Sequence, residues 1–318
     1  MLTARRRDAA ARSPSGFGFR GRLSVLRGAV VFPVLRTGWI PDPPDTRDYT
    51  VAHPRVRPTL DQLRVAAPVK PLPATTDLSA FFPPVVDQDS LNSCTAATTA
   101  GLISYFQRKA YGHSLDASVL FLYKIARNLL GVQGDSGATL RMTMQALRLF
   151  GALPESVWPS HAINVDAEPQ AYHYAFASNY KAKVYYRLDE AGLPPAALLD
   201  RVRTNLAAQL PSMFGFFVFP SIVLTGADGA IPYPSRGETP SESHALIAVG
   251  YDDARPIRNP IDGRTTIGAL RVRNSWGAAW GEGGYGWFPY ESILGGLTSD
   301  WWSLIETEFV DTGQFGLR

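Results

Sequence analysis

Cys94 is the only cysteine among 318 residues, and it stands where a polar loop passes into a stretch of small and apolar residues. Asn92 and Ser93, just before it, have side chains that typically cap the N-terminus of a helix. The apolar residues that follow recur at helical spacing as far as Phe106. Cys94 is therefore expected in the first turn of a helix, where unpaired N–H groups favour a nucleophilic thiolate. A buried structural cysteine is the alternative interpretation of this stretch.

A cysteine nucleophile needs a base and a group that orients the base. His244 opens an apolar strand, so a rigid element holds its ring, whereas the other four histidines lie in polar, Pro-rich or loop contexts. Asn274 ends another predicted strand and precedes a turn rich in Gly and Trp. Its side chain can accept the imidazole N–H, and Trp276 can cover that hydrogen bond and exclude water. Taken alone, this turn also fits a tryptophan-rich corner of a core.

Together with Gln88, these residues resemble the active site of the papain-like cysteine peptidases. Gln88 lies six residues before Cys94, which is the spacing of the family's oxyanion glutamine. The segments Ser243–Tyr251 and Arg273–Tyr285 are similar to the family's histidine and asparagine blocks. The resemblance covers roughly residues 77–310, and the asparagine block is its most specific part.

The residues next to the cysteine depart from the family signature. Asn92 replaces a glycine, Leu91 replaces a disulfide cysteine, and Thr95 replaces an aromatic residue. The histidine and the asparagine are 30 residues apart, more than is usual in the family, and Asp252–Thr266 is predicted to absorb the difference as a hairpin extension. A single cysteine rules out intrachain disulfides, so the chain resembles a bacterial subset of the family that lacks them.

The resemblance implies that Cys94 attacks a peptide carbonyl and forms a thioester acyl-enzyme, with His244 as general acid and base. Asn274 would orient His244, and Gln88 would donate to the oxyanion. Cys94 would be a thiolate paired with a protonated His244. Substrate is expected to bind at three places. The backbone of Gly137 would pair with the substrate chain beside Ser136, and Trp276 and Trp280 would contact substrate beside the asparagine. Ala245 and Gly215 would line the pocket for the second residue before the scissile bond.

The order of elements predicts an α+β fold of papain-like form, with a helical lobe and an antiparallel, β-barrel-like lobe on either side of the active-site cleft. The peptidase domain is expected over residues 77–318, mainly helical at about 88–180 and mainly β at about 183–318. Besides the helix at Cys94, helices are predicted at Ser118–Leu130, Leu140–Phe150 and Pro195–Leu210. Strands are predicted at Lys183–Leu188, Pro211–Phe219, Ser243–Tyr251, Gly268–Arg273, Gly284–Phe288 and Trp301–Val310.

The N-terminal quarter of the chain differs in composition from the rest. Residues 1–36 contain eight arginines and one acidic residue, which predicts a basic, disordered tail, with a signal peptide as the alternative. Residues 37–76 are rich in proline and predict an extended arm anchored by Trp39, Ile40 and Tyr49. Family members carry an inhibitory segment at this place. We therefore expect the arm to cross the cleft as a pro-segment and keep the chain latent, as a zymogen.

Composition narrows the possible partners. The formal net charge is +3, and because the tail is strongly basic the remainder is acidic, which disfavours a nucleic-acid partner. No apolar run is long enough to span a membrane, so the compartment, cytoplasmic or secreted, stays open. We expect a monomer that acts on protein or peptide substrates without a metal or cofactor. The alternatives are an acyltransferase or transglutaminase-like enzyme of the same chemistry, and a catalytically inactive binding module on this fold.

Overall fold

The computed structural model of the chain describes residues 37–65, 71–161 and 163–307, which belong to one compact unit, Val34–Arg318. The predicted basic tail, residues 1–36, lies outside the described residues. The α-helices are α1 (Arg57–Gln62), α2 (Cys94–Tyr111), α3 (Val119–Leu130), α4 (Leu140–Leu149), α5 (Ala171–Ala177), α6 (Pro195–Ala207) and α7 (Tyr290–Leu294). The strands are β1 (Thr75–Asp77), β2 (Ala182–Arg187), β3 (Ser212–Val218), β4 (Glu242–Arg258), β5 (Thr265–Arg273), β6 (Tyr285–Pro289) and β7 (Thr298–Thr307).

The helical part consists mainly of α2, α3 and α4, which pack against one another. Helix α3 begins at Ser118, whose hydroxyl accepts from the N–H of Phe121, and it ends at Gly131 in the left-handed conformation. Helix α4 begins in the same way at Thr139, whose side chain accepts from Met142. Serine or threonine before an apolar helix and glycine after it are strong local signals, which is why these helices were predictable from the sequence.

The β part is one antiparallel sheet in the order β2-β7-β3-β4-β5-β6, with β1 paired to β4. The expected barrel-like lobe is therefore an open sheet, whose path does not close on itself. Strands β4 and β5 extend past the body of the sheet as a long hairpin, in which Arg258 faces Thr265. This hairpin is the predicted extension between the histidine and the asparagine.

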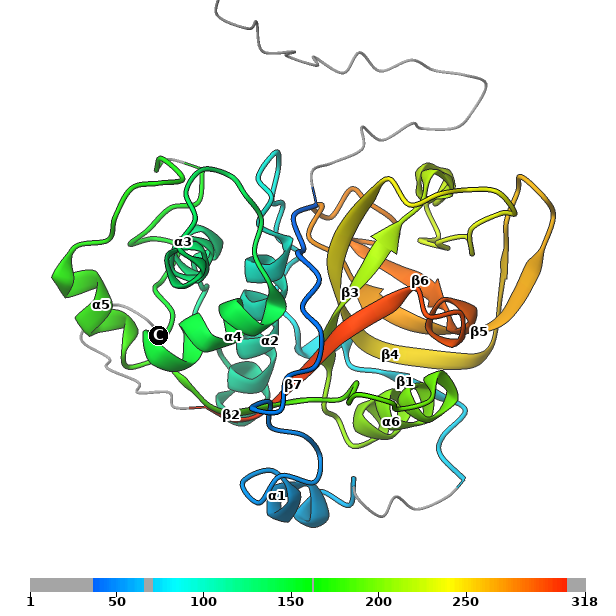
Figure 1. Ribbon diagram of the computed structural model, residues 1–318, viewed down its shortest axis with the longest axis horizontal. Coiled ribbons are helices and arrows are strands. Elements are labelled where there is room, and N and C mark those ends of the chain that lie inside the picture. The colour runs from blue at the N-terminus through cyan, green and yellow to red at the C-terminus, as the bar shows by residue number, and fades with distance from the viewer. Residues whose placement is uncertain (1–36, 66–70, 162, 308–318) are drawn as a thin grey trace, which may run out of the picture. The chain divides into compact units, whose positions relative to one another are not determined.

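Helix α2 packs against β4, so the element that begins with Cys94 lies on the strand that carries His244 (Figure 1). Gly101 lies at this contact. A Cβ atom on Gly101 would come within 2.8 Å of the Cδ1 atom of Ile247. The absence of a side chain at Gly101 therefore lets helix and strand approach closely, and this approach sets where the N-terminus of α2 lies relative to His244.

The arm departs from the prediction of a wholly extended segment. It contains the short helix α1, which has Pro58 in its first turn, where the missing N–H costs nothing. Leu60 of α1 is buried, so the helix forms by packing on the body. Helix α5 and the one-turn helix α7 were also not predicted, because short helices depend on tertiary packing more than on their own sequence.

Among the described residues, none of the helices has the length and hydrophobicity needed to cross a membrane.

Replacing Gly101 by Val should lower the free energy of unfolding by about 1–3 kcal/mol, because the added atoms overpack the contact with Ile247. Urea unfolding measures the effect. Ala110→Val, at an exposed position of the same helix, adds a valine without a crowded contact and should cost about 0.6 kcal/mol through helix propensity, whereas propensity alone would make Gly101→Val slightly stabilising. A stability of Gly101→Val equal to or above that of the unchanged protein would contradict the proposed close contact.

Candidate functional site

Cys94 is the first residue of α2, as predicted, and its side chain is fully buried. The predicted capping of this helix is wrong. Ser93 is the N-cap residue, but its backbone is not extended and its hydroxyl has no hydrogen-bond partner among the described residues. Asn92 instead uses its side chain to reach the carbonyl of Asp135 in a neighbouring loop. The N–H groups at the start of α2 are therefore not capped by Ser93.

His244 and Asn274 meet as the sequence predicts, although they come from different strands. The distance between His244 Nε2 and Asn274 Oδ1 is 2.8 Å. Because Oδ1 also accepts the N–H of Ser275, it is an acceptor, so Nε2 carries the hydrogen of the ring. His244 Nδ1 has no hydrogen-bond partner within the described ranges. The imidazole is thus oriented with its basic nitrogen free to exchange a proton.

Two tryptophans close this corner. The ring of Trp276 stacks on His244 at 4.6 Å between centroids and 23° between planes. Trp280 meets Trp276 edge-on at 5.7 Å. Trp280 is only 3% exposed, so in this state it supports Trp276 from the protein side. Trp276 therefore covers the ring that Asn274 orients, in keeping with the predicted role of excluding water.

Strand β4 brings His244 near Cys94, and the backbone N–H of Ala245, the next residue, lies close enough to the sulfur to lower the pKa of the thiol. Burial raises the pKa of the Cys94 thiol to about 12, although the backbone N–H groups of Ala245, Thr95 and Trp39 lower it. Burial also lowers the pKa of His244 to about 4, against the opposing hydrogen bond to Asn274. Both shifts favour the neutral forms, because the two groups are buried away from water. The thiolate–imidazolium pair stays a prediction for this site.

Gln88 joins the same site through the asparagine block. Its side-chain oxygen accepts from the Ser275 hydroxyl at 2.5 Å, and its backbone N–H donates to the Ser275 carbonyl at 2.9 Å. Because the amide oxygen binds Ser275, Gln88 Nε2 points away from Ser275. It lies 2.7 Å from the Leu91 carbonyl and 3.5 Å from the Thr37 carbonyl. The glutamine thus presents an N–H donor to a carbonyl of the arm.

The arm crosses the site itself, passing between the helices and the sheet (Figure 1). The Gly38 carbonyl accepts from Ala138 at 3.0 Å, and the Ile40 N–H donates to the Ala138 carbonyl at 2.9 Å. On the sheet side, the Ser243 hydroxyl donates to the Trp39 carbonyl. Trp39 is 1% exposed, as expected of an anchor, but Ile40 is 39% exposed and is not one. The arm is therefore bound over Cys94 by backbone pairing and one buried indole.

The indole of Trp39 occupies the pocket that was predicted from Gly215 and Ala245. These two residues face each other on β3 and β4. A Cβ atom on Gly215 would lie 2.0 Å from the indole ring, so only glycine leaves room for it. At the far end of the ring, Trp39 Nε1 donates to Asp300 Oδ2 at 3.0 Å. The pocket is deep, as its small residues suggested, and it ends in a carboxylate.

The arm pairs with Ala138 and not with its neighbour Gly137, whose pairing with a substrate chain stays a prediction. The Gly137 N–H donates to the Tyr123 hydroxyl at 2.8 Å, so Gly137 does not pair with the arm, and Ala138 makes both backbone bonds instead. Tyr123 in turn donates to Asp135, which also accepts from the Asn92 N–H. Ser136 turns its hydroxyl to the Gly137 carbonyl. Asn92, where the family has glycine, thus ties the cysteine segment to this loop.

Comparison with known proteins places this geometry in a family. No family model matches the sequence. The structure is similar to xylellain, a cysteine protease from Xylella fastidiosa, with 30% identity, a TM-score of 0.66, and coverage of 90% of this chain and all of xylellain. The chain belongs to the papain-like cysteine peptidases, and its activity is that of a cysteine endopeptidase.

Other relatives agree. An uncharacterized peptidase C1-like protein of Acanthamoeba polyphaga mimivirus is 27% identical over 85% of this chain and 86% of its own length. Procathepsin B S9 from Trypanosoma congolense shares the fold with a TM-score of 0.59, at 17% identity and 87% coverage of both chains. Some structures of similar fold are thus proforms of papain-like peptidases.

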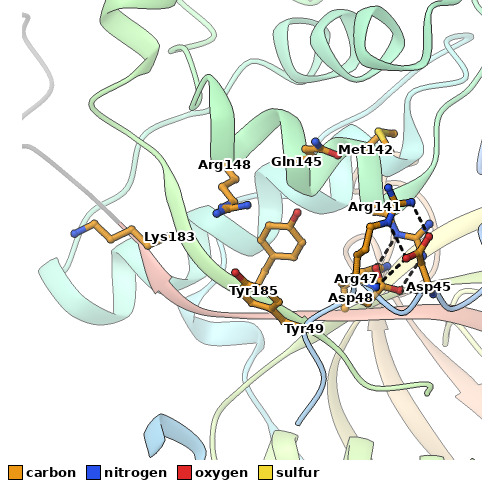
Figure 2. Close-up of a pocket in the computed structure, with 11 residues that line it drawn as sticks. Asp45, Arg47, Asp48, Tyr49, Arg141, Met142, Gln145, Arg148, Lys183 and Tyr185 are labelled. Atoms are coloured by element: carbon orange, nitrogen blue, oxygen red, sulfur yellow. Dashed lines mark hydrogen bonds and ion pairs between the residues drawn. The ribbon is translucent and has the colours of Figure 1, made fainter. Parts of the chain in front are cut away.

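In this papain-like peptidase, ion pairs hold the arm beyond the cleft. Arg141 of α4 binds Asp42. Its Nη2 also lies 2.8 Å from Asp48 Oδ2 (Figure 2). Arg187 donates to the Asp42 carbonyl at 2.9 Å and lies 3.5 Å from Asp48. A cavity of about 250 Å³ adjoins these pairs, and its lining includes Asp48 and Arg141 but neither Cys94 nor His244. These charged contacts of the arm therefore lie outside the catalytic corner.

Sequence reasoning missed Ala138, Ser275, Asp300 and the acidic residues of the arm. No local signal identifies them, since an alanine, a serine or an aspartate is ordinary until the fold shows what it touches. Among the described residues, no cluster of histidine, cysteine or acidic side chains is arranged to hold a metal ion.

Alkylation of Cys94 in the full chain should be slow at neutral pH and should speed up about tenfold per pH unit. A pKa of about 12 instead of 9.0 leaves about a thousandfold less thiolate. Because Cys94 is the only cysteine, iodoacetamide labelling followed by mass spectrometry measures this directly. The denatured chain serves as the control. Rapid labelling that does not vary between pH 5 and 8 would show an ion pair already formed.

Proposed function

We propose that Cys94 is the nucleophile of this endopeptidase, that His244 is its general acid and base, and that Asn274 orients His244. The arrangement of His244 supports this most directly: Asn274 holds Nε2 at 2.8 Å, Nδ1 is unpartnered among the described residues, and the next N–H along β4 contacts the sulfur. Nδ1 is thereby the nitrogen available to the thiol proton. Protein or peptide chains are the substrates, and the enzyme acts as a monomer.

When the arm leaves, water reaches the site and the cost of burying charge falls. The proton of Cys94 then moves to His244 Nδ1, and the N–H of Ala245 and the start of α2 stabilise the thiolate. The thiolate attacks the carbonyl carbon of a peptide bond. His244 returns the proton to the departing amine, leaving a thioester on Cys94, and then takes a proton from the water that releases the acyl group.

Gln88 stabilises the oxyanion through Nε2. The Thr37 carbonyl of the arm lies 3.5 Å from this nitrogen, so it stands where the oxygen of a substrate would be bound. The hydrogen bond from Ser275 to the other end of the amide fixes the direction in which Nε2 points. The donor is therefore oriented before substrate arrives, which is the condition for effective electrostatic stabilisation.

The arm is a pro-segment that keeps the full chain latent. It places a backbone carbonyl at Gln88, an N–H at the sulfur of Cys94 and an indole in the pocket of Gly215. We place the pro-segment over residues 37–76 and the peptidase domain from residue 77, a division that falls within β1, where the chain joins the sheet. The likeness to the Xylella fastidiosa protease supports a bacterial origin for the chain.

Weakening the arm's ion pairs should activate the full chain. Asp42→Asn together with Asp48→Asn leaves Arg141 without its charged partners and should raise hydrolysis of a fluorogenic peptide at least about tenfold, because bonds to charged groups contribute about 1.5–3 kcal/mol. Arg47→Gln is the matched control, since Arg47 is 86% exposed and pairs within the arm, with Asp45. Activity equal to that of Arg47→Gln would argue against latency.

In the activated full chain, Gln88→Ala should lower kcat by roughly 10²–10³ with little change in KM, because the donor acts mainly in the transition state. Ser275→Ala should have a smaller effect of the same kind, since it loosens Gln88 without removing it. Cys94→Ala should abolish cleavage. Cleavage that requires an added amine acceptor would indicate acyl transfer instead, and a change confined to KM would exclude the oxyanion role.

A further inference from the structure

Asp135 joins two segments that meet at the site. Its Oδ1 accepts from the backbone N–H of Asn92 at 2.9 Å and from the Tyr123 hydroxyl at 2.8 Å. Its own carbonyl accepts from Asn92 Nδ2 at 2.8 Å. Asn92 lies two residues before Cys94, and Asp135 lies in the loop that reaches Ala138, which pairs with the arm. One aspartate therefore fastens the cysteine segment to the loop that binds a chain.

Tyr123 extends this connection into the loop. Its hydroxyl donates to Asp135 and accepts the N–H of Gly137, each at 2.8 Å. Tyr123 is fully buried, and this burial and the neighbouring carboxylate raise its pKa, so the hydroxyl keeps its proton. The guanidinium of Arg127 lies over the ring, 4.4 Å from its centroid. The hydroxyl is therefore a fixed link between Asp135 and the backbone of Gly137.

The two fastened segments are the walls between which the arm passes. A Cβ atom on Gly38 would lie 2.1 Å from the Asn92 carbonyl oxygen. A Cβ atom on Gly137 would lie 2.4 Å from the Gly38 carbonyl oxygen. Gly38 thus contacts both walls closely. The cleft is as wide here as the distance between Asn92 and Gly137, and the hydrogen bonds of Asp135 hold that distance.

We propose that Asp135 and Tyr123 are positioning residues of the peptidase. They hold the Gly137–Ala138 backbone at the distance from the cysteine segment at which a bound chain presents its carbonyl to Cys94. The inference rests on the proposed function of Cys94. Such positioning matters for the rate, because a displacement of about 1 Å at the reacting centre can slow a reaction roughly 10²-fold.

Peptide hydrolysis tests this role in the full chain activated by Asp42→Asn and Asp48→Asn. Asp135→Ala should lower kcat/KM for a fluorogenic peptide about tenfold or more, because the loop is no longer held in place. The ester p-nitrophenyl acetate has no peptide chain to pair with the loop, so its hydrolysis at Cys94 should be unchanged. Equal losses for peptide and ester, or no loss for the peptide, would overturn the inference.

Three further variants separate positioning from stability. Asp135→Asn keeps an acceptor oxygen for both donors and should retain most of the peptide cleavage that Asp135→Ala loses. Tyr123→Phe keeps the ring without the hydroxyl and should act like Asp135→Ala. Ser118→Ala removes the N-cap of α3, the helix of Tyr123, so it lowers stability away from the loop. A ratio of peptide to ester hydrolysis that falls as far in Ser118→Ala as in Asp135→Ala would contradict the positioning role.

Alkylation of Cys94 in the full chain gives a readout that needs no catalysis. Cys94 is fully buried, so its rate of labelling by iodoacetamide at fixed pH reports how often the arm opens. Asp135→Ala should raise this rate about tenfold, because Ala138 is no longer held for its pairing with the arm. Ile40→Pro removes the N–H that donates to the Ala138 carbonyl. In that background Asp135→Ala should therefore have a clearly smaller effect.

Ile40→Ala is the matched control, since it keeps the N–H and changes only a side chain that is 39% exposed. In its presence Asp135→Ala should keep its full effect on alkylation. If the effects of Ile40→Pro and Asp135→Ala simply multiply, the inference is wrong. No cleavage of peptide or ester by any variant would count against the proposed function, whereas the coupling of these two variants would still support the positioning of the loop.

Discussion

The packing of α2 on β4 is the contact on which the rest of the site depends. Cys94 comes from the start of the helix and His244 from the strand, so their relation is set by how closely the two elements approach at Gly101 and Ile247. The same contact brings the N–H of Ala245 to the sulfur. Asn274 directly follows the last residue of β5, the strand that pairs with β4 in the sheet. A catalytic constellation built from separate elements in this way is as rigid as the packing between them.

Access of water decides the chemical state of that constellation. With the arm in place, burial outweighs every hydrogen bond that favours charge, so the pKa of Cys94 is raised and that of His244 is lowered. The arm therefore has two effects on the site: its indole fills the pocket at Gly215, and its burial of Cys94 favours the thiol over the thiolate. Both effects come from one short stretch around Trp39. The ion pairs of Arg141 with Asp42 and of Arg187 with Asp48 bind the arm to the body a few residues further along the chain.

The departures from the family signature have local explanations. Asn92 takes the place of a glycine and uses two hydrogen bonds to hold Asp135, which supports Tyr123 and through it the Gly137 N–H. The chain has a single cysteine, and in its described part polar contacts of this kind and buried ion pairs such as Arg187–Asp189 join distant segments. Two polar groups next to Cys94 remain unsatisfied. The hydroxyl oxygens of Ser93 and Thr95 are buried and have no hydrogen-bond partner in the described part of the chain.

The sequence by itself determined the elements that have strong local signals, and it named the residues that we expect to carry the chemistry. Helices α2, α3, α4 and α6 and strands β2 to β7 could be predicted, and Gln88, Cys94, His244 and Asn274 could be named as the expected site, because their types and spacing follow from local structure and from the reaction. Strand β1 was not predicted, since its three residues become a strand by pairing with β4. Only the tertiary structure decided what the arm does at the site, why Ala138 rather than Gly137 pairs with it, and that Asp300 ends the pocket. Those contacts join residues up to 261 positions apart. They depend on burial and on the relative placement of packed elements, which leave no mark in the order of residues.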